Sequence, residues 1–276
     1  MKRPVPIAGV IGNPITQSRS PRLHRHWLQR YGLAGDYVAM QVSEHDLSDV
    51  IRAMPKMGFV GCNVTLPHKV EVMKLADQVS DRATLIGAAN TLIFKDNGQI
   101  YADNTDGYGF MANLRQNAPD WDPVGGPAVV LGAGGAARAI IVALADAGVK
   151  QIRLSNRTRA KAEALRTEFG ARIEVVDWVQ AGNCLDDAHT VINTTSLGMD
   201  GAPELRVPLD GLRAGTLVTD IVYAPLRTKF LETAEAAGCV TVDGLGMLLH
   251  QGVPGFERWF GQRPQVDDAL RRAVLG

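Results

Sequence analysis

The sequence predicts an α/β protein of two domains, the first with a mixed sheet and the second with a parallel sheet. Apolar runs of strand length alternate with amphipathic segments almost throughout the chain, which is the pattern of β-α-β units. A Pro/Gly-rich stretch at residues 121–127 interrupts this alternation, and the pattern then restarts. A chain of 276 residues is long enough for one or two domains, so the restart indicates a second one.

The part of the chain before this interruption reads as alternating strands and helices that end in a hairpin. Ser20 and Pro21 are expected to open a helix as its N-cap and first helical residue. The run Asp96-Asn97-Gly98 predicts a tight turn between two antiparallel strands. Strands are expected at residues 6–12, 36–42 and 61–65, helices at 20–33, 46–58 and 107–117, and the hairpin at 90–104.

The strand at residues 61–65 is unusual because it carries polar side chains on one face. Asn63 and Thr65 point to the same side, since side chains two apart on a strand share a face. Pro67 ends the strand because proline has no N–H to donate, and Lys69 then begins a helix-like stretch to residue 79. A packed strand gains nothing from two polar groups facing a lysine, whereas a ligand with several hydroxyl groups would bond to them.

The second part of the chain predicts a parallel sheet with helices between its strands. Strands are expected at residues 127–134, 151–156, 172–176, 189–195, 216–223 and 239–244, and helices at 135–148, 159–170 and 228–238. Two further helices, at 246–261 and 266–276, close the chain.

Composition excludes several classes of function. The formal net charge is zero, so no field attracts nucleic acid or an anionic membrane. The N-terminal apolar run is too short and proline-broken for a signal peptide, and no stretch approaches the ~18 apolar residues of a membrane-spanning helix. Three widely spaced cysteines suggest a reducing compartment, and we therefore expect a cytoplasmic protein. We expect no metal, because His24 and His26 diverge on their helix and no zinc spacing occurs.

A glycine-rich turn predicts a dinucleotide site of the Rossmann type. Gly132, Gly134 and Ala137 fit the pattern G-x-G-x-x-G/A directly after an apolar strand and at the start of a helix. Gly132 allows the tight turn, and Gly134 lets the backbone approach a pyrophosphate at the helix N-terminus. The alternative is a helix turn that glycines tighten for packing alone.

The end of the next strand favours NADP over NAD. An NAD site commonly has an acidic residue about 20 residues after the glycines, to bond the ribose 2′-hydroxyl. Here Asn156 stands near that position and Arg157, Thr158, Arg159 and Lys161 follow, so a guanidinium can pair with a 2′-phosphate. The alternative is that these basic residues only begin a solvated helix.

Other polar stretches before the interruption have ordinary explanations when taken singly. Ser20 can cap a helix, Asn90 can turn a loop and Asp106 can cap the next helix. Together, however, the motifs GNPITQSRSP, NVTLPHK, GAANT, NTDGYGF, GAGGAAR, SNRT, NTTSLGM and GLGMLLHQG occur in order over nearly the whole chain. The sequence resembles the NADP-dependent shikimate dehydrogenases of the shikimate/quinate dehydrogenase family.

The resemblance implies a fold, an activity and a set of site residues. The fold would consist of a substrate domain at residues 1–106 and 247–276 and an NADP domain at residues 107–246. The activity would be the reversible reduction of 3-dehydroshikimate to shikimate with NADPH, a step in aromatic amino acid biosynthesis. The partner would be a small-molecule substrate, and the protein a monomer or homodimer.

By the matching motifs, Lys69 and Asp106 would be the catalytic pair and would also contact substrate. The substrate residues would be Ser18, Ser20, Asn63, Thr65, Asn90, Tyr223 and Gln251. The cofactor residues would be Asp81, Gly132, Ala133, Gly134, Gly135, Ala136, Asn156, Arg157, Thr158, Arg159, Lys161, Thr195, Ile221 and Gly244, with Asp81 the weaker candidate.

The chain departs from the family pattern in a few positions. Gln17 replaces a usual histidine, and Ala89 a usual valine. His68 stands where the family has another residue, and a surface or packing role is the simpler explanation for it. Lys161 replaces an arginine of the 2′-phosphate clamp, which would soften discrimination against NAD, and Arg159 is a candidate substitute.

Alternative functions are a quinate-preferring dehydrogenase of broader specificity and a cofactor-sensing homologue without catalysis. A pseudoenzyme has no physical need to keep both Lys69 and Asp106. A methylene-tetrahydrofolate dehydrogenase would share the architecture but would not need the loop with Ser18 and Ser20.

Overall fold

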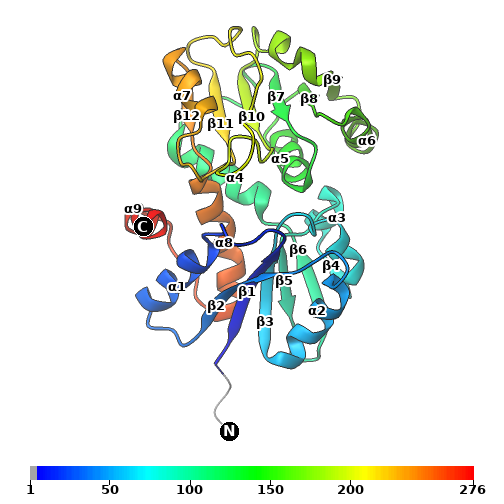
Figure 1. Cartoon of the computed structure of the whole chain (residues 1–276), viewed down its shortest axis with the longest axis vertical. Helices are drawn as coiled ribbons and strands as arrows, with labels where there is room; N and C mark the ends of the chain where they lie inside the picture. Colours follow the sequence, from blue (N-terminus) through cyan, green and yellow to red (C-terminus); the bar gives the residue numbers. More distant parts are fainter. Residues whose placement is uncertain (1–4) are drawn as a thin grey trace. The chain divides into compact units, whose positions relative to one another are not determined.

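The structure, a computed structural model, describes residues 5–276 and divides into two compact units (Figure 1). The first consists of the described part of Met1–Gly109 together with Leu248–Gly276, and the second of Phe110–Met247. The chain leaves the first unit within helix α4 (Asp106–Asn117) and returns to it within helix α8 (Leu245–Phe260).

The first unit is built on a mixed six-stranded sheet with the order β2-β1-β3-β5-β6-β4. Strands β1, β2 and β3 are parallel, β5 pairs antiparallel with β3, and β5 and β6 form the hairpin that the sequence predicts. Its strands are β1 (Ile7–Gly12), β2 (Asp36–Gln41), β3 (Phe59–Val64), β4 (Gln78–Val79), β5 (Thr91–Phe94) and β6 (Ile100–Asp103). Its remaining helices are α1 (Ser20–Arg30), α2 (Leu47–Ala53), α3 (Asp81–Ile86) and α9 (Asp268–Leu275), with the 3-10 helices η1 (Met54–Met57) and η2 (Glu71–Leu75).

Apolar side chains cover this sheet on both faces. On one face a cluster that includes Ile11, Ile51 and Leu92 joins the sheet to α2, η1, η2 and α3. On the other face Val10 and Tyr37 pack against Trp259 of α8. The sheet is therefore the middle layer of the unit, and the loops at its strand ends are left to carry polar groups.

The second unit is a parallel six-stranded sheet with the order β12-β11-β10-β7-β8-β9, which is the doubly wound order of a Rossmann fold. Its strands are β7 (Ala128–Leu131), β8 (Ile152–Ser155), β9 (Ile173–Val176), β10 (Thr190–Asn193), β11 (Leu217–Asp220) and β12 (Val240–Val242). Its helices are α5 (Gly135–Asp146), α6 (Arg159–Phe169) and α7 (Lys229–Ala236), with the 3-10 helix η3 (Trp178–Cys184).

The strands of this second sheet are apolar on both faces, as parallel strands between two helical layers must be. Val130 faces a core cluster with residues of α5 and α6, whereas its neighbours Val129 and Leu131 face a cluster with residues of η3 and α7. Ile192 and Val191 divide in the same way on the next strand of the sheet.

Three local expectations differ from the structure. Arg19, not Ser20, is the N-cap of α1, and Ser20 is already helical because Pro21 is accommodated anywhere in the first turn. The stretch from Lys69 is a turn followed by η2, and Gln78–Val79 forms β4 because these residues pair with β6. Residues 46–58 divide into α2 and η1 at Pro55, which cannot continue an α-helix.

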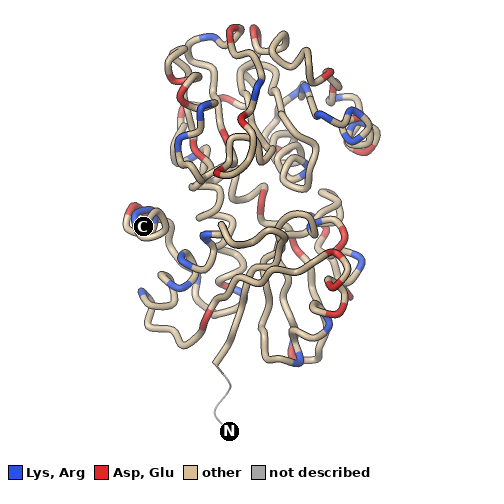
Figure 2. The backbone as a smooth tube through the Cα atoms, viewed as in Figure 1, with Lys and Arg blue, Asp and Glu red and all other residues tan. Residues whose placement is uncertain are grey.

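Two elements, α3 and η3, were not expected, because their short segments carry little helical periodicity. Lys and Arg are interspersed with Asp and Glu along both units (Figure 2), in keeping with the zero net charge. Within residues 5–276 no helix is long and apolar enough to cross a membrane.

Gly61 tests how closely α8 packs on the first sheet. A Cβ at this position would overlap the indole nitrogen of Trp259 and the backbone carbonyl of Leu92, which hydrogen-bond to each other at 3.0 Å. We expect Gly61→Ala to lower the free energy of unfolding by about 1–3 kcal/mol, measured by urea denaturation. Ala39→Ser, which adds one atom at an exposed strand position, is the control and should change it by less than about 0.5 kcal/mol.

Equal stability of Gly61→Ala and Ala39→Ser would contradict the close packing of α8 on β3.

Candidate active site

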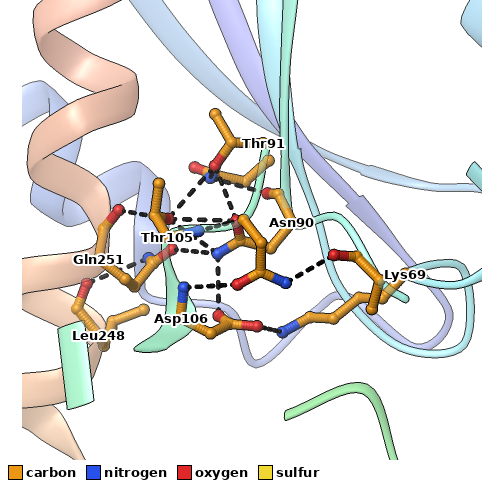
Figure 3. Close-up of polar contacts among 10 residues, drawn as sticks. Lys69, Asn90, Thr91, Thr105, Asp106, Leu248 and Gln251 are labelled. Atoms are coloured by element: carbon orange, nitrogen blue, oxygen red, sulfur yellow. Dashed lines mark hydrogen bonds and ion pairs between the residues drawn. The ribbon is translucent and has the colours of Figure 1, made fainter. Parts of the chain in front are cut away.

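A partly buried ion pair joins Lys69 and Asp106 in the first unit (Figure 3). Lys69 Nζ donates to Asp106 Oδ2 at 2.6 Å, and the two side chains are only 16% and 5% exposed. Lys69 lies in the turn after β3, and Asp106 is the first residue of α4. The structure thus brings together the two side chains that the sequence predicts as a catalytic pair, although they are 37 residues apart.

Asn90 holds Asp106 in place. Its Nδ2 lies 2.8 Å from Asp106 Oδ1, 3.0 Å from Thr105 Oγ1 and 3.1 Å from Gln251 Oε1 (Figure 3). Its Oδ1 accepts from the Thr105 backbone N–H at 2.8 Å. An amide group has only two N–H donors, so these acceptors saturate it. Asn90 therefore ties the start of β5 to the start of α4 and to α8.

Asn63 is likewise bonded to protein groups at the end of β3. Its Oδ1 accepts from the Tyr37 hydroxyl at 2.7 Å, and its Nδ2 donates to the backbone carbonyl of Asn90 at 3.1 Å and to Thr91 Oγ1 at 3.2 Å. His24 stacks on the Tyr37 ring at 4.0 Å, and burial lowers its pKa to about 3, so it packs as a neutral ring. Through the bond from Asn63 to the Asn90 carbonyl, these contacts hold the backbone of Asn90 in place.

The serine loop after β1 and the residue after β3 carry hydroxyl groups. Ser18 is half-buried and Ser20 is 4% exposed, while Thr65 is half-buried. Ser18 Oγ accepts from the Ser20 backbone N–H at a long 3.4 Å. The side-chain hydroxyls of Ser20 and Thr65 make no hydrogen bond to any residue that the structure describes, so they remain able to bond to a ligand.

His68 has a packing role, as its sequence context suggests. It is 1% exposed, and its Nε2 lies 2.8 Å from the backbone carbonyl of Val42. Within the described residues no group of three metal-ligating side chains occurs.

The glycine turn of the second unit has the geometry that close approach of a ligand requires. Gly132 has φ +112°, and a Cβ there would lie 2.6 Å from Thr194 Oγ1 and 2.9 Å from Thr195 Cγ2. Gly134 is the N-cap of α5, and a Cβ built on it meets no atom within 4 Å. The first glycine is therefore required by the turn, whereas the second leaves open space above the helix N-terminus.

Of the side chains after β8, some bond to other protein groups, whereas others form no ion pair within the part of the chain that the structure describes. Asn156 Oδ1 accepts from the Ala133 backbone N–H at 3.2 Å, and its Nδ2 donates to the Thr158 carbonyl at 2.8 Å. Arg157 and Lys161 are exposed and form no ion pair with the described residues.

Arg159 already forms ion pairs with two carboxylates. It donates to Asp177 at 2.5 Å and to Glu163 at 2.9 Å. Free cations for a 2′-phosphate are thus Arg157 and Lys161 rather than Arg159.

The remaining predicted cofactor residues lie at the ends of β10, β11 and β12, except one. Gly244 packs directly on the backbone of Ile221, because a Cβ there would overlap the Ile221 carbonyl. Thr195 follows β10 next to Gly132. Asp81, the weaker candidate, is an exposed residue of α3 in the first unit, apart from the other predicted cofactor residues in sequence and unit. Tyr223 lies in the second unit, unlike the other predicted substrate residues.

Three residues of the polar network were missed from sequence. Thr105 donates from Oγ1 to the Gln251 carbonyl at 2.9 Å, and Thr91 and Tyr37 bond to Asn63. Thr105 and Thr91 stand inside the motifs NTDG and GAANT, so their place in those motifs was the available signal. No sequence motif indicated Tyr37. It lies on β2 and its partner Asn63 on β3, and these two strands are separated in the sheet by β1.

The two units together have the features of a two-domain, dinucleotide-binding oxidoreductase. Family models described as shikimate dehydrogenase substrate binding domain, shikimate/quinate 5-dehydrogenase and shikimate 5′-dehydrogenase C-terminal domain match residues 10–92, 123–199 and 244–275. The chain belongs to the shikimate dehydrogenase family.

Individual relatives agree with this assignment. The chain is 69% identical to a shikimate dehydrogenase (NADP(+)) of Cereibacter sphaeroides over 98% of its own length and 97% of the relative's. A quinate dehydrogenase of Corynebacterium glutamicum solved with NAD superposes with a TM-score of 0.88 at 31% identity, covering 98% of each chain. A shikimate 5-dehydrogenase of Thermus thermophilus solved with NADP(H) and shikimate gives a TM-score of 0.85 at 35% identity, covering 97% of this chain and 99% of that one.

A buried carboxyl group in the second unit sets a pH dependence of stability. Asp220, at the end of β11, is 0% exposed, and burial raises its pKa from 3.8 to about 6. The folded state then binds the proton more tightly than the unfolded state, so this group's contribution to stability is full below about pH 4 and is lost as pH rises through about 6.

We expect the free energy of unfolding of the wild type, minus that of Asp220→Asn, to fall by about 2 kcal/mol between pH 4 and pH 7. Urea denaturation of both proteins across this range measures it, and subtraction removes the titration of the other carboxylates. A difference that does not vary with pH would contradict the assignment.

Proposed function

We propose that this protein catalyses the reversible reduction of 3-dehydroshikimate to shikimate with NADPH. The observation that carries the proposal is the Lys69–Asp106 pair at 2.6 Å, held by Asn90 among amide and hydroxyl groups. Such a lysine can transfer one proton next to a substrate rich in hydroxyls. The NADP(+)-dependent relatives support the same reaction.

Lys69 acts as the general acid of the reduction. When bound, NADPH supplies the hydride to the carbonyl carbon. The Lys69 ammonium donates a hydrogen bond to the keto oxygen and gives up its proton as the carbonyl becomes an alcohol. In the oxidation direction the neutral amine takes the hydroxyl proton. Asp106 orients Lys69 from Oδ2, while its Oδ1 is held by Asn90.

Substrate recognition rests on the polar groups of the first unit. Ser18 and Ser20 bind the carboxylate, and Thr65 and Gln251 bond to hydroxyl groups. Asn63 and Asn90, like Gln251, already bond to protein atoms, and these three amides hold the surrounding hydroxyl groups at the site. A wall of this kind rejects analogues that leave its polar atoms unpaired. Tyr223 is proposed to complete it.

NADP binding is proposed for the second unit, and substrate binding for the first. The turn at Gly132, the open space at Gly134 and the free cations Arg157 and Lys161 fit a pyrophosphate and a 2′-phosphate. Thr195, Ile221 and Gly244 would line the nicotinamide end.

The cytoplasm is the proposed location. Cys62, Cys184 and Cys239 are all free thiols, which a reducing compartment maintains.

Quinate oxidation is the second candidate function. This candidate is retained because the chain superposes on a quinate dehydrogenase solved with NAD over 98% of each chain. Asn156 and Arg157 stand near the position where an NAD site commonly has an acidic residue, which argues against the NAD-dependent form of this candidate.

The reaction is tested by following nicotinamide absorbance at 340 nm with shikimate or quinate, each against NADP and NAD. Turnover with shikimate and NADP alone supports the proposal in full. Equal use of quinate or NAD would assign the protein to the broader-specificity branch, and no turnover with any pair would overturn the proposal in favour of a regulatory role.

Replacing Lys69 tests the proton transfer. We expect Lys69→Ala to lower kcat by about 10²–10⁴, because general acid–base catalysis contributes that much. Lys74→Ala, five residues on, is the control, since Lys74 is 69% exposed and pairs only with Glu71 in the described structure. Steady-state kinetics and circular dichroism of both variants measure activity and folding, and near-wild-type turnover of folded Lys69→Ala would end the assignment.

Cofactor choice is tested at the two arginines after β8. We expect Arg157→Ala to raise KM for NADP on the order of 10-fold to 100-fold and to leave KM for NAD nearly unchanged, because a charge-assisted bond to the 2′-phosphate is lost. Arg159→Ala should have a smaller effect, since Asp177 and Glu163 already occupy this side chain. A larger effect of Arg159→Ala would reverse their roles.

A further inference from the structure

Asp220 accepts hydrogen bonds from three different segments of the second unit. Its Oδ1 accepts from the Val222 backbone N–H at 2.9 Å and from Asn193 Nδ2 at 3.0 Å, and its Oδ2 accepts from Thr228 Oγ1 at 2.7 Å. These donors belong to the loop after β11, to the end of β10 and to the N-cap of α7. One buried carboxylate thus joins all three.

Asn193 extends the connection to the loop after β10. Its Oδ1 accepts from both the backbone N–H and the hydroxyl of Thr195, at 3.0 Å and 2.7 Å. Its Nδ2 also donates to the Leu197 carbonyl at 3.1 Å, and the Leu197 N–H returns to Thr195 Oγ1 at 3.0 Å. The shape of residues 193–197 therefore depends on the orientation of a single amide, and Asp220 sets that orientation.

This network lies where a doubly wound sheet binds its ligand. Strand order reverses between β7 and β10, and ligands of such sheets bind outside the carboxyl ends of the strands at that point. Thr194 and Thr195 follow β10 there and close against Gly132, the first glycine of the turn after β7. Ile221, directly after Asp220, packs on Gly244.

We propose, on the basis of the proposed function, that Asp220 is a positioning residue that acts through Asn193 to hold the loops after β10 and β11 in the shape that binds NADP. It does not touch the cofactor. Its carboxylate orders the backbone and hydroxyl groups of Thr195 and the backbone of Ile221 and Val222. Thr195 and Ile221 are proposed cofactor residues, and Val222 follows directly after Ile221.

The choice of a carboxylate is informative. Three neutral donors converge on Asp220, and only a carboxylate accepts from all of them, since an amide would present its own N–H groups to one side. Burying a carboxylate costs stability, and a polar group of this kind is most easily explained where its precise hydrogen-bond pattern serves a site.

Binding of NADP in the absence of substrate tests the proposal by isothermal titration calorimetry. We expect Asp220→Asn to raise Kd for NADP on the order of 10-fold to 100-fold. One of the three donors is then left unpaired, and the Asn193 amide is no longer held in one orientation by the carboxylate. Asp210→Asn is the matched control, an exposed carboxyl of the same unit, and should bind as the wild type does. In steady-state kinetics KM for NADP should rise more than KM for shikimate.

A second pair of variants is independent of the folding of Asp220→Asn. Thr228→Val removes the hydroxyl that donates to Asp220 Oδ2, whereas Thr228→Ser keeps it. We expect Thr228→Val to weaken NADP binding several-fold and Thr228→Ser to retain wild-type Kd. Hydrogen exchange of Thr195, Leu197 and Val222 amides should quicken in Thr228→Val, with protection of β7 unchanged.

The outcomes separate the two proposals. A wild type that does not bind NADP would overturn the proposed function. A wild type that binds NADP, with Asp220→Asn and Thr228→Val binding equally well, would overturn the positioning role and leave the proposed function intact. If Asp220→Asn does not fold, equal Kd values of Thr228→Val and Thr228→Ser overturn it.

Discussion

The saturated amide of Asn90 is the interaction on which the first unit's chemistry depends. Its two N–H donors face Asp106, Thr105 and Gln251, and its oxygen takes the Thr105 N–H, so it joins β5, α4 and α8. A buried amide with unpaired atoms would be costly, and this cost keeps the ends of the three elements in one arrangement. Asp106 therefore presents its second oxygen to Lys69 in a defined direction.

The two units use the same physical device in different surroundings. Each has an apolar sheet between two layers and gathers its polar groups at the strand ends, where backbone N–H and carbonyl groups no longer pair with a neighbouring strand. In the first unit an amide, Asn90, collects acceptors around a carboxylate. In the second a carboxylate, Asp220, collects donors from three segments.

Glycine and charge decide what the second unit can accept. At Gly132 a side chain would strike Thr194 and Thr195, so the tight turn after β7 depends on glycine. At Gly134 the space is open instead. Beyond β8, Arg159 pairs with two carboxylates, whereas Arg157 and Lys161 form no ion pair with the residues that the structure describes; this division depends on the position of Asp177, 18 residues after Arg159.

The sequence by itself determined the α/β class, nearly every strand and the glycine turn, because these depend on local periodicity and on residues a few positions apart. It also indicated Lys69, Asp106 and Asn90 through ordered motifs. Only the tertiary structure decided that the Asn63 amide bonds to Tyr37 and Thr91 and that Thr105 bonds to Gln251. It also decided that Asp220 is buried. The physical reason is that a hydrogen-bond partner is set by proximity in space, and strands adjacent in a sheet can be tens of residues apart in the chain.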